Sequence, residues 1–358
     1  MEVSTAVFLY GTLRAAPVRR AVLGDAAGEQ AALPDHRIMK AGDDGAPFPA
    51  PAPDDHAEGL LVMLDAPALD RLDAYEGLFG YRRREVTVTA DGAARSAWAY
   101  FPEAAPEGAV PWDFAAWQAA EGAREALFAE EAVRELDVLG HEGAARRLGP
   151  IAARAEARYL AAGPHPATRR RIAAPGDITV AARRLPYAEF LAVESYRLSH
   201  RRFDGAMSPW LERACLVSAD AVTVLPYDPA RKRVMLIEQV RIGPLARGDA
   251  AAWTLEAIAG RVDGGETPEQ AAHREAEEEA HLTLSRLIAL PGYYTTPGIA
   301  SEFIHPFIGL AELPDGAARI AGADAEGEDI RGHLMGPEEA LELVTTGEVG
   351  NGPAMLSL

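Results

Sequence analysis

The stretch Gly260–Leu282, GRVDGGETPEQAAHREAEEEAHL, joins a Gly-rich turn to a segment rich in Ala and Glu. Its second half predicts a helix over residues 268–282, because Pro suits the first helical position and Thr267 suits the capping position before it. Positions i, i+3 and i+4 of this helix place three carboxylates on one face, those of Glu275, Glu278 and Glu279.

This concentration of like charge indicates a divalent cation. Carboxylates at these spacings repel each other by roughly 0.2–0.5 kcal/mol per pair, and a cation removes the conflict. Hard carboxylate oxygens select Mg²⁺ or Mn²⁺, and Mg²⁺ completes its shell with water and substrate phosphates. The turn Asp263-Gly264-Gly265 leaves room for a ligand beside the helix start. The alternative is an exposed acidic helix that matches the pattern by chance.

The charged positions follow one spacing: Gly, five residues, Glu, seven residues, then Arg-Glu-Ala-x-Glu-Glu. This spacing resembles the Nudix box of the Nudix hydrolases, and every charged position matches, namely Glu266, Arg274, Glu275, Glu278 and Glu279. One position departs, since His281 stands where the family usually has Gly. If residue 281 must adopt a positive φ, His costs about 1 kcal/mol more than Gly.

Length, charge and apolar content limit the class of protein. The 358 residues exceed what one hydrophobic core usually serves, so two domains are expected. The formal net charge of −19 disfavours binding to nucleic acid or to anionic membranes. No apolar run approaches a membrane helix in length and no secretion signal is visible, so we expect a cytoplasmic protein. The single Cys215, among small and apolar neighbours, is interpreted as a buried residue rather than a nucleophile.

The first part of the chain carries a second group of motifs: FLYGTLR near its start, then EGLLVML, LDRLDAYEG and YRRREVTV. In this order they resemble the gamma-glutamylcyclotransferase-like (AIG2-like) family, a small β-barrel with flanking helices. The resemblance implies that the backbone of Tyr10, Gly11, Thr12 and Leu13 cradles a gamma-glutamyl group and that Glu76 is the general acid/base. The alternative for Glu76 is an ordinary charged residue in a turn.

Helical periodicity over residues 111–162 predicts two or three helices that close the first domain, while the Ala- and Pro-rich residues 46–53 are interpreted as a loop. We place a gamma-glutamylcyclotransferase-like domain with a helical extension at residues 1–162, a linker at 163–171 and a Nudix domain at 172–358. The expected fold class is α+β with two domains, the second an α/β/α sandwich around a mixed sheet.

The second domain resembles the bacterial ADP-ribose pyrophosphatases in six further motifs: LSHRRFDGAMS, LPYDP, LIEQVRI, LEAIAG, TTPGIASE and GEDIR. The resemblance implies a Mg²⁺ site, with Mn²⁺ as a substitute, whose ligands are the Ala259 carbonyl and the carboxylates of Glu275, Glu278, Glu279 and Glu328. Glu278 is also expected to be catalytic. The related enzymes are homodimers in which an early segment crosses to the other subunit, so we expect a homodimer here.

The same resemblance implies phosphate contacts from Arg213 and Arg241 and a general base at Glu326. Their alternatives are ordinary surface charges and a solvated acidic loop. Among the histidines, His273 and His305 are interpreted as structural rather than catalytic.

Two classes of function remain open. The first is an enzyme that hydrolyses ADP-ribose, or another nucleoside diphosphate derivative, to AMP and ribose 5-phosphate or the corresponding products. The second is a regulatory protein that senses a nucleotide without turning it over and uses the first domain only for binding. The complete set of charged positions in the motif favours the enzyme, because a sensor can dispense with several of them.

Overall fold

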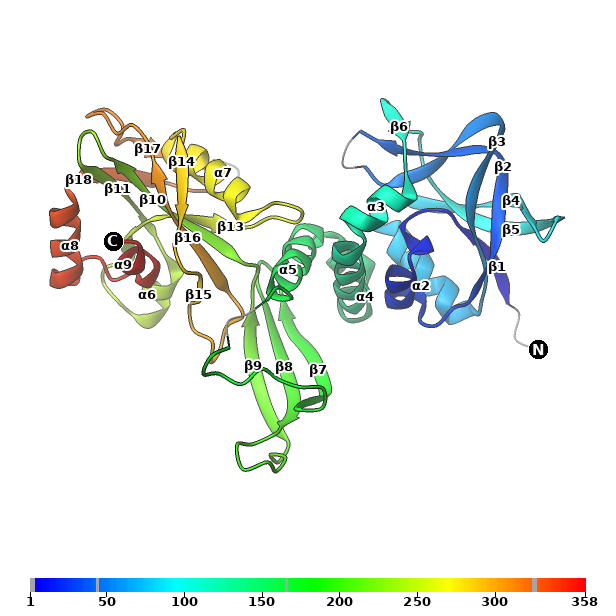
Figure 1. Cartoon of the computed structure of the whole chain (residues 1–358), viewed down its shortest axis with the longest axis horizontal. Helices are drawn as coiled ribbons and strands as arrows, with labels where there is room; N and C mark the ends of the chain where they lie inside the picture. Colours follow the sequence, from blue (N-terminus) through cyan, green and yellow to red (C-terminus); the bar gives the residue numbers. More distant parts are fainter. Residues whose placement is uncertain (1–3, 43–44, 165–166, 324–326) are drawn as a thin grey trace. The chain divides into compact units, whose positions relative to one another are not determined.

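This computed structural model describes residues 4–42, 45–164, 167–323 and 327–358. The chain forms two compact units, Met1–Gly163 and Pro164–Leu358, named unit 1 and unit 2 (Figure 1). No helix within the described ranges is long and apolar enough to cross a membrane.

Unit 1 is built on six strands: β1 (Thr5–Leu9), β2 (Gly28–Ala41), β3 (Pro47–Leu64), β4 (Tyr81–Ala90), β5 (Ala93–Pro102) and β6 (Ala109–Pro111). Their order in the sheet is β3-β1-β5-β4-β2-β6, with β1 antiparallel to β3 and parallel to β5. Because β2 also pairs with β3, the ladders form the cycle β3-β1-β5-β4-β2-β3. The structure shows this cycle of paired strands, and the barrel expected from the sequence remains a prediction.

The stretch expected to be a loop, residues 46–53, is mostly strand, because β3 begins at Pro47. Its prolines stand at every second position and pair with β2, for example Pro47 with Lys40 and Pro49 with Ile38. Since strand residues alternate in direction, prolines spaced by two lose N–H groups on one side only. A composition rich in proline therefore predicted a loop where the spacing permits an edge strand.

The helices of unit 1 share one apolar core with the sheet. They are η1 (Thr12–Arg14), α1 (Ala16–Leu23), α2 (Ala66–Gly77), α3 (Phe114–Ala120), α4 (Gly122–Ala145) and α5 (Leu148–Ala161). Val18, Leu72, Ala132 and Ile151 come from four of these helices and pack in the same buried cluster as strand residues. The three helices from α3 to α5 confirm the helical periodicity predicted after residue 111.

Buried ion pairs also join α4 to α5. Arg147 donates to both carboxylate oxygens of Glu135, at 2.7 and 3.1 Å. Arg154 pairs with Glu131 at 3.1 Å, and Arg158 reaches the same carboxylate at 2.9 Å. The two glutamate side chains are 0% exposed. Periodicity predicted the helices but not these pairs, because it does not tell which polar positions of two helices face each other.

Unit 2 contains a nine-stranded sheet made of β10 (Ala221–Asp228), β11 (Arg233–Val240), β12 (Trp253–Glu256), β13 (Ile258–Arg261), β14 (Arg286–Ala289), β15 (Tyr293–Tyr294), β16 (Phe303–Leu310), β17 (Ile320–Ala321) and β18 (Ile330–Met335). The main order is β14-β16-β10-β11-β18-β17, with β10 and β16 parallel. The helices of unit 2 are α6 (Ile242–Arg247), α7 (Pro268–Ala280), α8 (Pro337–Thr346) and α9 (Gly352–Ser357).

Strand β11 shows that helices cover both faces of this sheet. Met235 and Ile237 belong to the cluster that contains the alanines of α7, whereas Val234 and Leu236 belong to the cluster that contains residues of α8 and α9. Adjacent strand residues point to opposite faces, so the sheet lies between two helical layers.

A separate antiparallel sheet of three strands comes first in unit 2: β7 (Ile178–Ala188), β8 (Ala192–His200) and β9 (Leu211–Val217). Its own buried cluster is small, with Leu185, Ala192 and Val217 as buried members. Cys215 lies in β9 and is partly exposed rather than buried, so its predicted burial is wrong.

Helix α7 has the predicted start and a shorter end. The Thr267 hydroxyl accepts from the Gln270 N–H at 3.2 Å, and the Gln270 side chain accepts from the Thr267 N–H at 2.8 Å, which forms a capping box. The helix ends at Ala280 rather than at residue 282, because His281 adopts a left-handed conformation with φ 52° and ψ 42°.

His281 therefore occupies a backbone conformation that favours glycine. We expect His281→Gly to stabilise unit 2 by about 1 kcal/mol, the scale of the penalty for a side chain at positive φ. Chemical denaturation checks this change, with His281→Ala as the control, since alanine loses the imidazole but keeps the Cβ. Equal stability of the glycine and alanine variants contradicts the backbone explanation.

Candidate active site

Strand β13 and helix α7 bring the acidic motif against the sheet. Glu275 and Glu279 of α7 are buried, at 9% and 2% exposure, whereas Glu278 remains exposed. A Cβ on Gly260 of β13 would lie 1.7 Å from Oε1 of Glu275. Only glycine at position 260 leaves space for this carboxylate, so the first residue of the motif serves the packing of the helix on the strand.

Arg274 connects three glutamates of the motif. Its Nε and Nη2 donate to the two oxygens of Glu266 at 3.0 and 2.9 Å. Its Nη1 donates to Glu275 at 2.6 Å and to Glu278 at 3.1 Å, and Nη2 also donates to the Arg261 carbonyl at 2.9 Å. The bonds to Glu266, followed by the charge of Glu275, raise the pKa of Arg274 above its usual value. Arg274 therefore stays charged and neutralises part of the acidic face.

Glu279 faces the sheet. Its Oε2 accepts from the Ala259 N–H at 2.9 Å, and its Oε1 accepts from Nε2 of Gln239 at 3.3 Å. Burial raises the pKa of Glu279 to about 8, and the charges of Glu275 and Glu328 add to this effect. Burial also raises the pKa of Glu275 to about 7, although Arg274 acts in the opposite direction. For both carboxyls, the positive charge of the neighbouring arginines is too weak to offset the loss of solvation on burial.

Of the other predicted site residues, the structure places Glu328 close to the acidic face of α7 but not Arg213. Glu328 acts electrostatically on both buried carboxyls and accepts from the Ala323 N–H at 3.1 Å. Glu326 lies outside the described residues. Arg213 is exposed on β9, where it donates to the Glu212 carbonyl, and in the described part of the chain no hydrogen bond or ion pair joins it to α7.

Arg241 follows β11 and donates from Nε and Nη2 to one oxygen of Glu256, at 3.0 and 2.7 Å. Although burial lowers the pKa of Arg241, Glu256, Glu279 and Glu328 together raise it. Arg241 is therefore the predicted phosphate ligand that lies within electrostatic reach of the acidic motif.

The donor set fits a hard divalent cation in its chemistry. Glu275 and Glu279 are buried carboxyls whose ionised forms a cation would stabilise, and oxygen ligands are those that Mg²⁺ prefers. As the side chains stand, no three His, Cys, Asp or Glu residues in the described ranges surround a common point suited to a metal ion. Arg274 bonds to only one oxygen of each neighbouring carboxylate, Oε1 of Glu275 and Oε2 of Glu278.

Unit 1 brings its predicted residues together. Tyr10 is buried and its hydroxyl donates to the Tyr100 carbonyl, and within the described ranges the N–H groups of residues 11–13 have no acceptor. Glu76 lies at the end of α2, where burial and then the charge of Glu125 raise its pKa to about 8. Burial and then the charge of Glu76 raise the pKa of Tyr10, so the Tyr10 hydroxyl and the Glu76 carboxyl lie within electrostatic reach.

Sequence reasoning missed several contacts of both sites. Gln239 and Glu256, which bond to Glu279 and Arg241, lie in the quoted motifs LIEQVRI and LEAIAG and could have been found there. Glu125 had no signal, because its helix showed only periodicity. His305 bonds to Asp220 at 2.9 Å, in agreement with a structural role.

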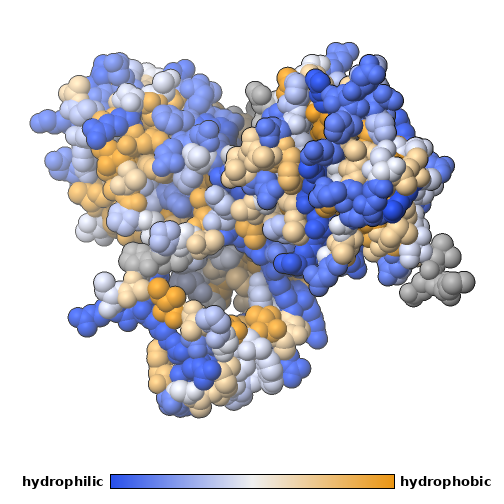
Figure 2. Space-filling model, turned by 45° about the vertical axis from the view of Figure 1, so that its right-hand side comes forward, coloured by the Kyte–Doolittle hydropathy of each residue, from blue (hydrophilic) through white to orange (hydrophobic). Residues whose placement is uncertain are grey.

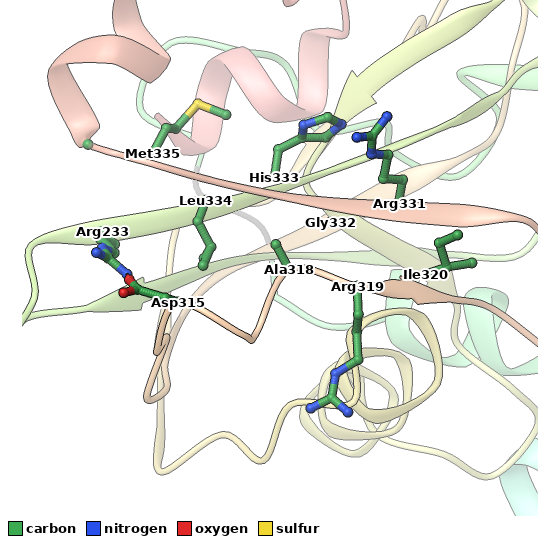
Figure 3. Close-up of a pocket in the computed structure, with 11 residues that line it drawn as sticks. Arg233, Asp315, Ala318, Arg319, Ile320, Arg331, Gly332, His333, Leu334 and Met335 are labelled. Carbon is green, nitrogen blue, oxygen red and sulfur yellow. The ribbon is translucent and has the colours of Figure 1, made fainter.

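A cavity of about 690 Å³ lies beside β18, and none of these residues lines it (Figure 3). It is lined by β18, by residues 318–320 and by Arg233 and Asp315, and by none of the glutamates of α7. Figure 3 shows the side chains of Arg331 and Arg319 on opposite sides of the strands. Their guanidinium groups do not converge on one ligand.

The contact between Gly260 and Glu275 allows a direct test. We expect Gly260→Ala to displace the Glu275 carboxylate, to destabilise unit 2 by about 1–3 kcal/mol and to weaken Mn²⁺ binding. Denaturation and electron paramagnetic resonance titration measure the two effects. Gly243→Ala is the matched control, because a Cβ at that position meets no atom within 4 Å. Wild-type stability and Mn²⁺ affinity of Gly260→Ala would show that the carboxylate does not need this space.

Comparison with known proteins assigns each unit. A family model described as "Gamma-glutamyl cyclotransferase, AIG2-like" matches residues 7–119, and one described as "NUDIX domain" matches residues 217–356. The ADP-ribose pyrophosphatase of Escherichia coli (strain K12) is 35% identical over 182 residues, which cover 51% of this chain and 86% of that protein. The enzyme of that name from Haemophilus influenzae is 35% identical over 184 residues, or 51% and 84%.

The GDP-mannose pyrophosphatase of Escherichia coli O9:H4 (strain HS) is 34% identical over 139 residues, which cover 39% of this chain and 71% of that protein. The match to the NUDIX model includes β13 and α7, where the motif of Arg274 and its glutamates lies. The chain therefore belongs to the NUDIX family of the bacterial ADP-ribose pyrophosphatases and carries, before its NUDIX domain, an AIG2-like gamma-glutamyl cyclotransferase domain.

Proposed function

We propose that unit 2 hydrolyses a nucleoside diphosphate sugar in the presence of Mg²⁺, with ADP-ribose as the preferred substrate. The observation that carries this proposal is the acidic face of α7, where two buried carboxyls lie beside Glu278, Glu328 and Arg241. The pyrophosphatase relatives support the same class of substrate.

Hydrolysis forms a bond between a water oxygen and a phosphorus atom and breaks the bond from that phosphorus to the bridging oxygen, which releases AMP and ribose 5-phosphate. Bound Mg²⁺ would neutralise the diphosphate and lower the pKa of water. We assign its ligands to the carboxylates of Glu275, Glu278, Glu279 and Glu328 and to the Ala259 carbonyl. Glu278 is the most exposed of these carboxylates.

The remaining side chains orient the substrate and move the proton. Arg241 can present its planar guanidinium to a phosphate. Its ion pair with Glu256 orients the guanidinium, and the charge of Glu279 acts on it, so it lies within electrostatic reach of the acidic motif. We assign Arg213 to the same task in the assembled protein and Glu326 to proton acceptance from the attacking water. Arg274 holds Glu275 and Glu278 in place and stays charged throughout.

Glu279→Gln tests the metal assignment. The substitution keeps the shape but removes one charge from a buried carboxyl, so AMP release from ADP-ribose with Mg²⁺ should fall by orders of magnitude while the unfolding midpoint changes little. Glu277→Gln is the matched control, since Glu277 is exposed on the same helix and should retain full turnover. Wild-type turnover of Glu279→Gln would refute the role given to this carboxylate.

A panel of nucleoside diphosphate compounds decides the alternatives. Faster release from GDP-mannose or another diphosphate would move the preference away from ADP-ribose. Tight binding without turnover of any compound would favour a nucleotide sensor.

We also propose that the protein is a homodimer in which the sheet β7-β8-β9 meets a second copy. This sheet has few buried residues of its own but exposes large apolar side chains, among them Ile178, Val180 and Tyr187, and Trp210 directly before β9 is exposed as well. Figure 2 shows hydrophobic patches on the sheet β7-β8-β9, which forms the lowest part of the view. Such exposed apolar surface is typical of an interface. Arg213 on β9 would then approach the acidic motif of the other copy.

Val180→Glu places a charge on the exposed apolar side of β7, so light scattering at micromolar concentration should change from dimer to monomer and ADP-ribose turnover should fall. The control is Thr179→Glu, which puts the same charge on the opposite side of the same strand. A wild-type monomer with full activity would remove the dimer proposal.

A second candidate function belongs to unit 1. We propose that it releases 5-oxoproline from a gamma-glutamyl amine, because Glu76 acts electrostatically on Tyr10, which directly precedes the turn whose N–H groups have no acceptor within the described ranges. The α-amine nitrogen bonds to the γ-carbonyl carbon, the bond from that carbon to the leaving amine breaks, and Glu76 carries the proton from the attacking to the leaving nitrogen. The N–H groups hold the developing oxyanion.

Glu76→Gln should abolish 5-oxoproline release by the full chain, because glutamine cannot accept the proton. In the wild type the rate should rise with pH through about 8, since the deprotonated carboxylate is the active form. Asp70→Asn serves as the control, because Asp70 is exposed on the same helix α2. Absence of release from every member of a gamma-glutamyl panel would leave unit 1 a binding domain.

A further inference from the structure

Helix α4 brings a second carboxyl to the candidate site of unit 1. The hydroxyl of Tyr75 donates to Oε1 of Glu125 at 3.3 Å, and Tyr75 directly precedes Glu76 on α2. Tyr75 is 2% exposed, so its hydroxyl needs a partner inside the protein. Helix α4 begins at Gly122, after the last residue, 119, that the AIG2-like family model matches. Glu125 is therefore a contribution of this chain's helical extension.

Aromatic contacts fix α4 against the end of α2. The ring of Tyr75 lies 5.4 Å from that of Phe79, which lies 6.0 Å from the ring of Phe128 on α4. Ala129 and Leu136 of α4 are buried in the same core as Leu72 and Tyr75 of α2. Since Glu125 stands one turn before Phe128 and Ala129, this packing holds its carboxyl close to the end of α2.

Glu125 and Glu76 are two acidic side chains that interact electrostatically and have no basic partner in the described ranges. In the described ranges neither carboxyl forms an ion pair with Lys, Arg or His, and after burial Glu125 is the largest reason why the pKa of Glu76 is raised. The other titratable or charged groups around the two carboxyls are Tyr10 after β1, Asp73 and Tyr75 on α2, Tyr81, Arg82 and Arg83 on β4, Tyr100 on β5, and Glu121 and His141 on α4. Arg82 pairs with Glu103. Among them, Arg83 pairs with Asp73 and not with either glutamate.

We propose that Glu125 is a positioning residue for Glu76: it holds Tyr75 by a hydrogen bond and presents a like charge to Glu76 across the α2–α4 interface. This inference rests on the proposed cyclotransferase function of unit 1. The hydrogen bond fixes the backbone from which Glu76 projects, and the charge makes Glu76 a stronger base. Both effects come from outside the part of the chain that the AIG2-like model covers.

Two substitutions in the full chain separate the hydrogen bond from the charge. Glu125→Gln keeps an oxygen that can accept from Tyr75 but removes the charge, so the acidic limb of the pH profile for 5-oxoproline release should shift down by about one unit. Tyr75→Phe removes the hydrogen bond and keeps both carboxyls, so kcat should fall several-fold while KM changes little. Asp137→Asn, on the exposed side of α4, should leave the profile unchanged.

Carbon NMR titration of glutamate carboxyls provides a readout that does not need turnover, with Glu76→Gln to assign the signal. The titration midpoint of Glu76 should fall in Glu125→Gln. If the wild type releases 5-oxoproline but Glu125→Gln keeps the wild-type profile and midpoint, the inference is overturned and the proposed function stands. If the wild type releases none, the proposed function fails, and an unchanged midpoint of Glu76 overturns the inference separately.

Discussion

The ion pair between Arg274 and Glu266 fixes the geometry of the acidic motif. Glu266 precedes α7 and also accepts from the Asp263 N–H at 3.1 Å, while Arg274 reaches the carbonyl of Arg261 on β13. One guanidinium therefore joins strand, turn and helix. Because its remaining donors hold two carboxylates of α7, loss of Arg274 would free both the backbone turn and the acidic face.

The motif was predictable from the sequence because its chemistry is local. A helix places residues three and four apart on one face, so the spacing of Glu275, Glu278 and Glu279 was sufficient to predict their common side. The positive φ of His281 agrees with the glycine that the Nudix family usually has at this position. The space that Gly260 provides was not predictable, because it depends on how α7 packs across β13.

Other features depended on contacts between distant residues. The prolines of β3 predicted a loop because composition carries no information about which edge of a strand is paired. Strand β9 was missed because its charged residues Glu212 and Arg213 interrupt the apolar pattern. The partner of Tyr75 was also not predictable, since it lies 50 positions away on another helix. Glu326 was placed by family resemblance alone and lies outside the described residues.

The two units use the same physical effect for different chemistry. In both, burial makes a carboxyl reluctant to ionise, as the raised pKa values of Glu279 and Glu76 show. Glu279 is held by an N–H and an amide, which leaves it suited to a ligand that supplies charge. Glu76 is surrounded by tyrosines and a second glutamate, which suits a group that must take up and release a proton.

The buried ion pairs between α4 and α5 determine where unit 1 can be cut. Glu131 and Glu135 have no exposed side-chain surface, and Arg147, Arg154 and Arg158, which pair with them, come from or directly precede α5. Without the segment from Arg147 onward, Glu135 would lose the two arginines that pair with it, and Glu131 would lose Arg154 and Arg158 but keep Arg134 of its own helix. The helical extension therefore belongs to the same compact unit as the sheet, and a fragment that ends before Arg147 loses part of the positive charge that balances α4.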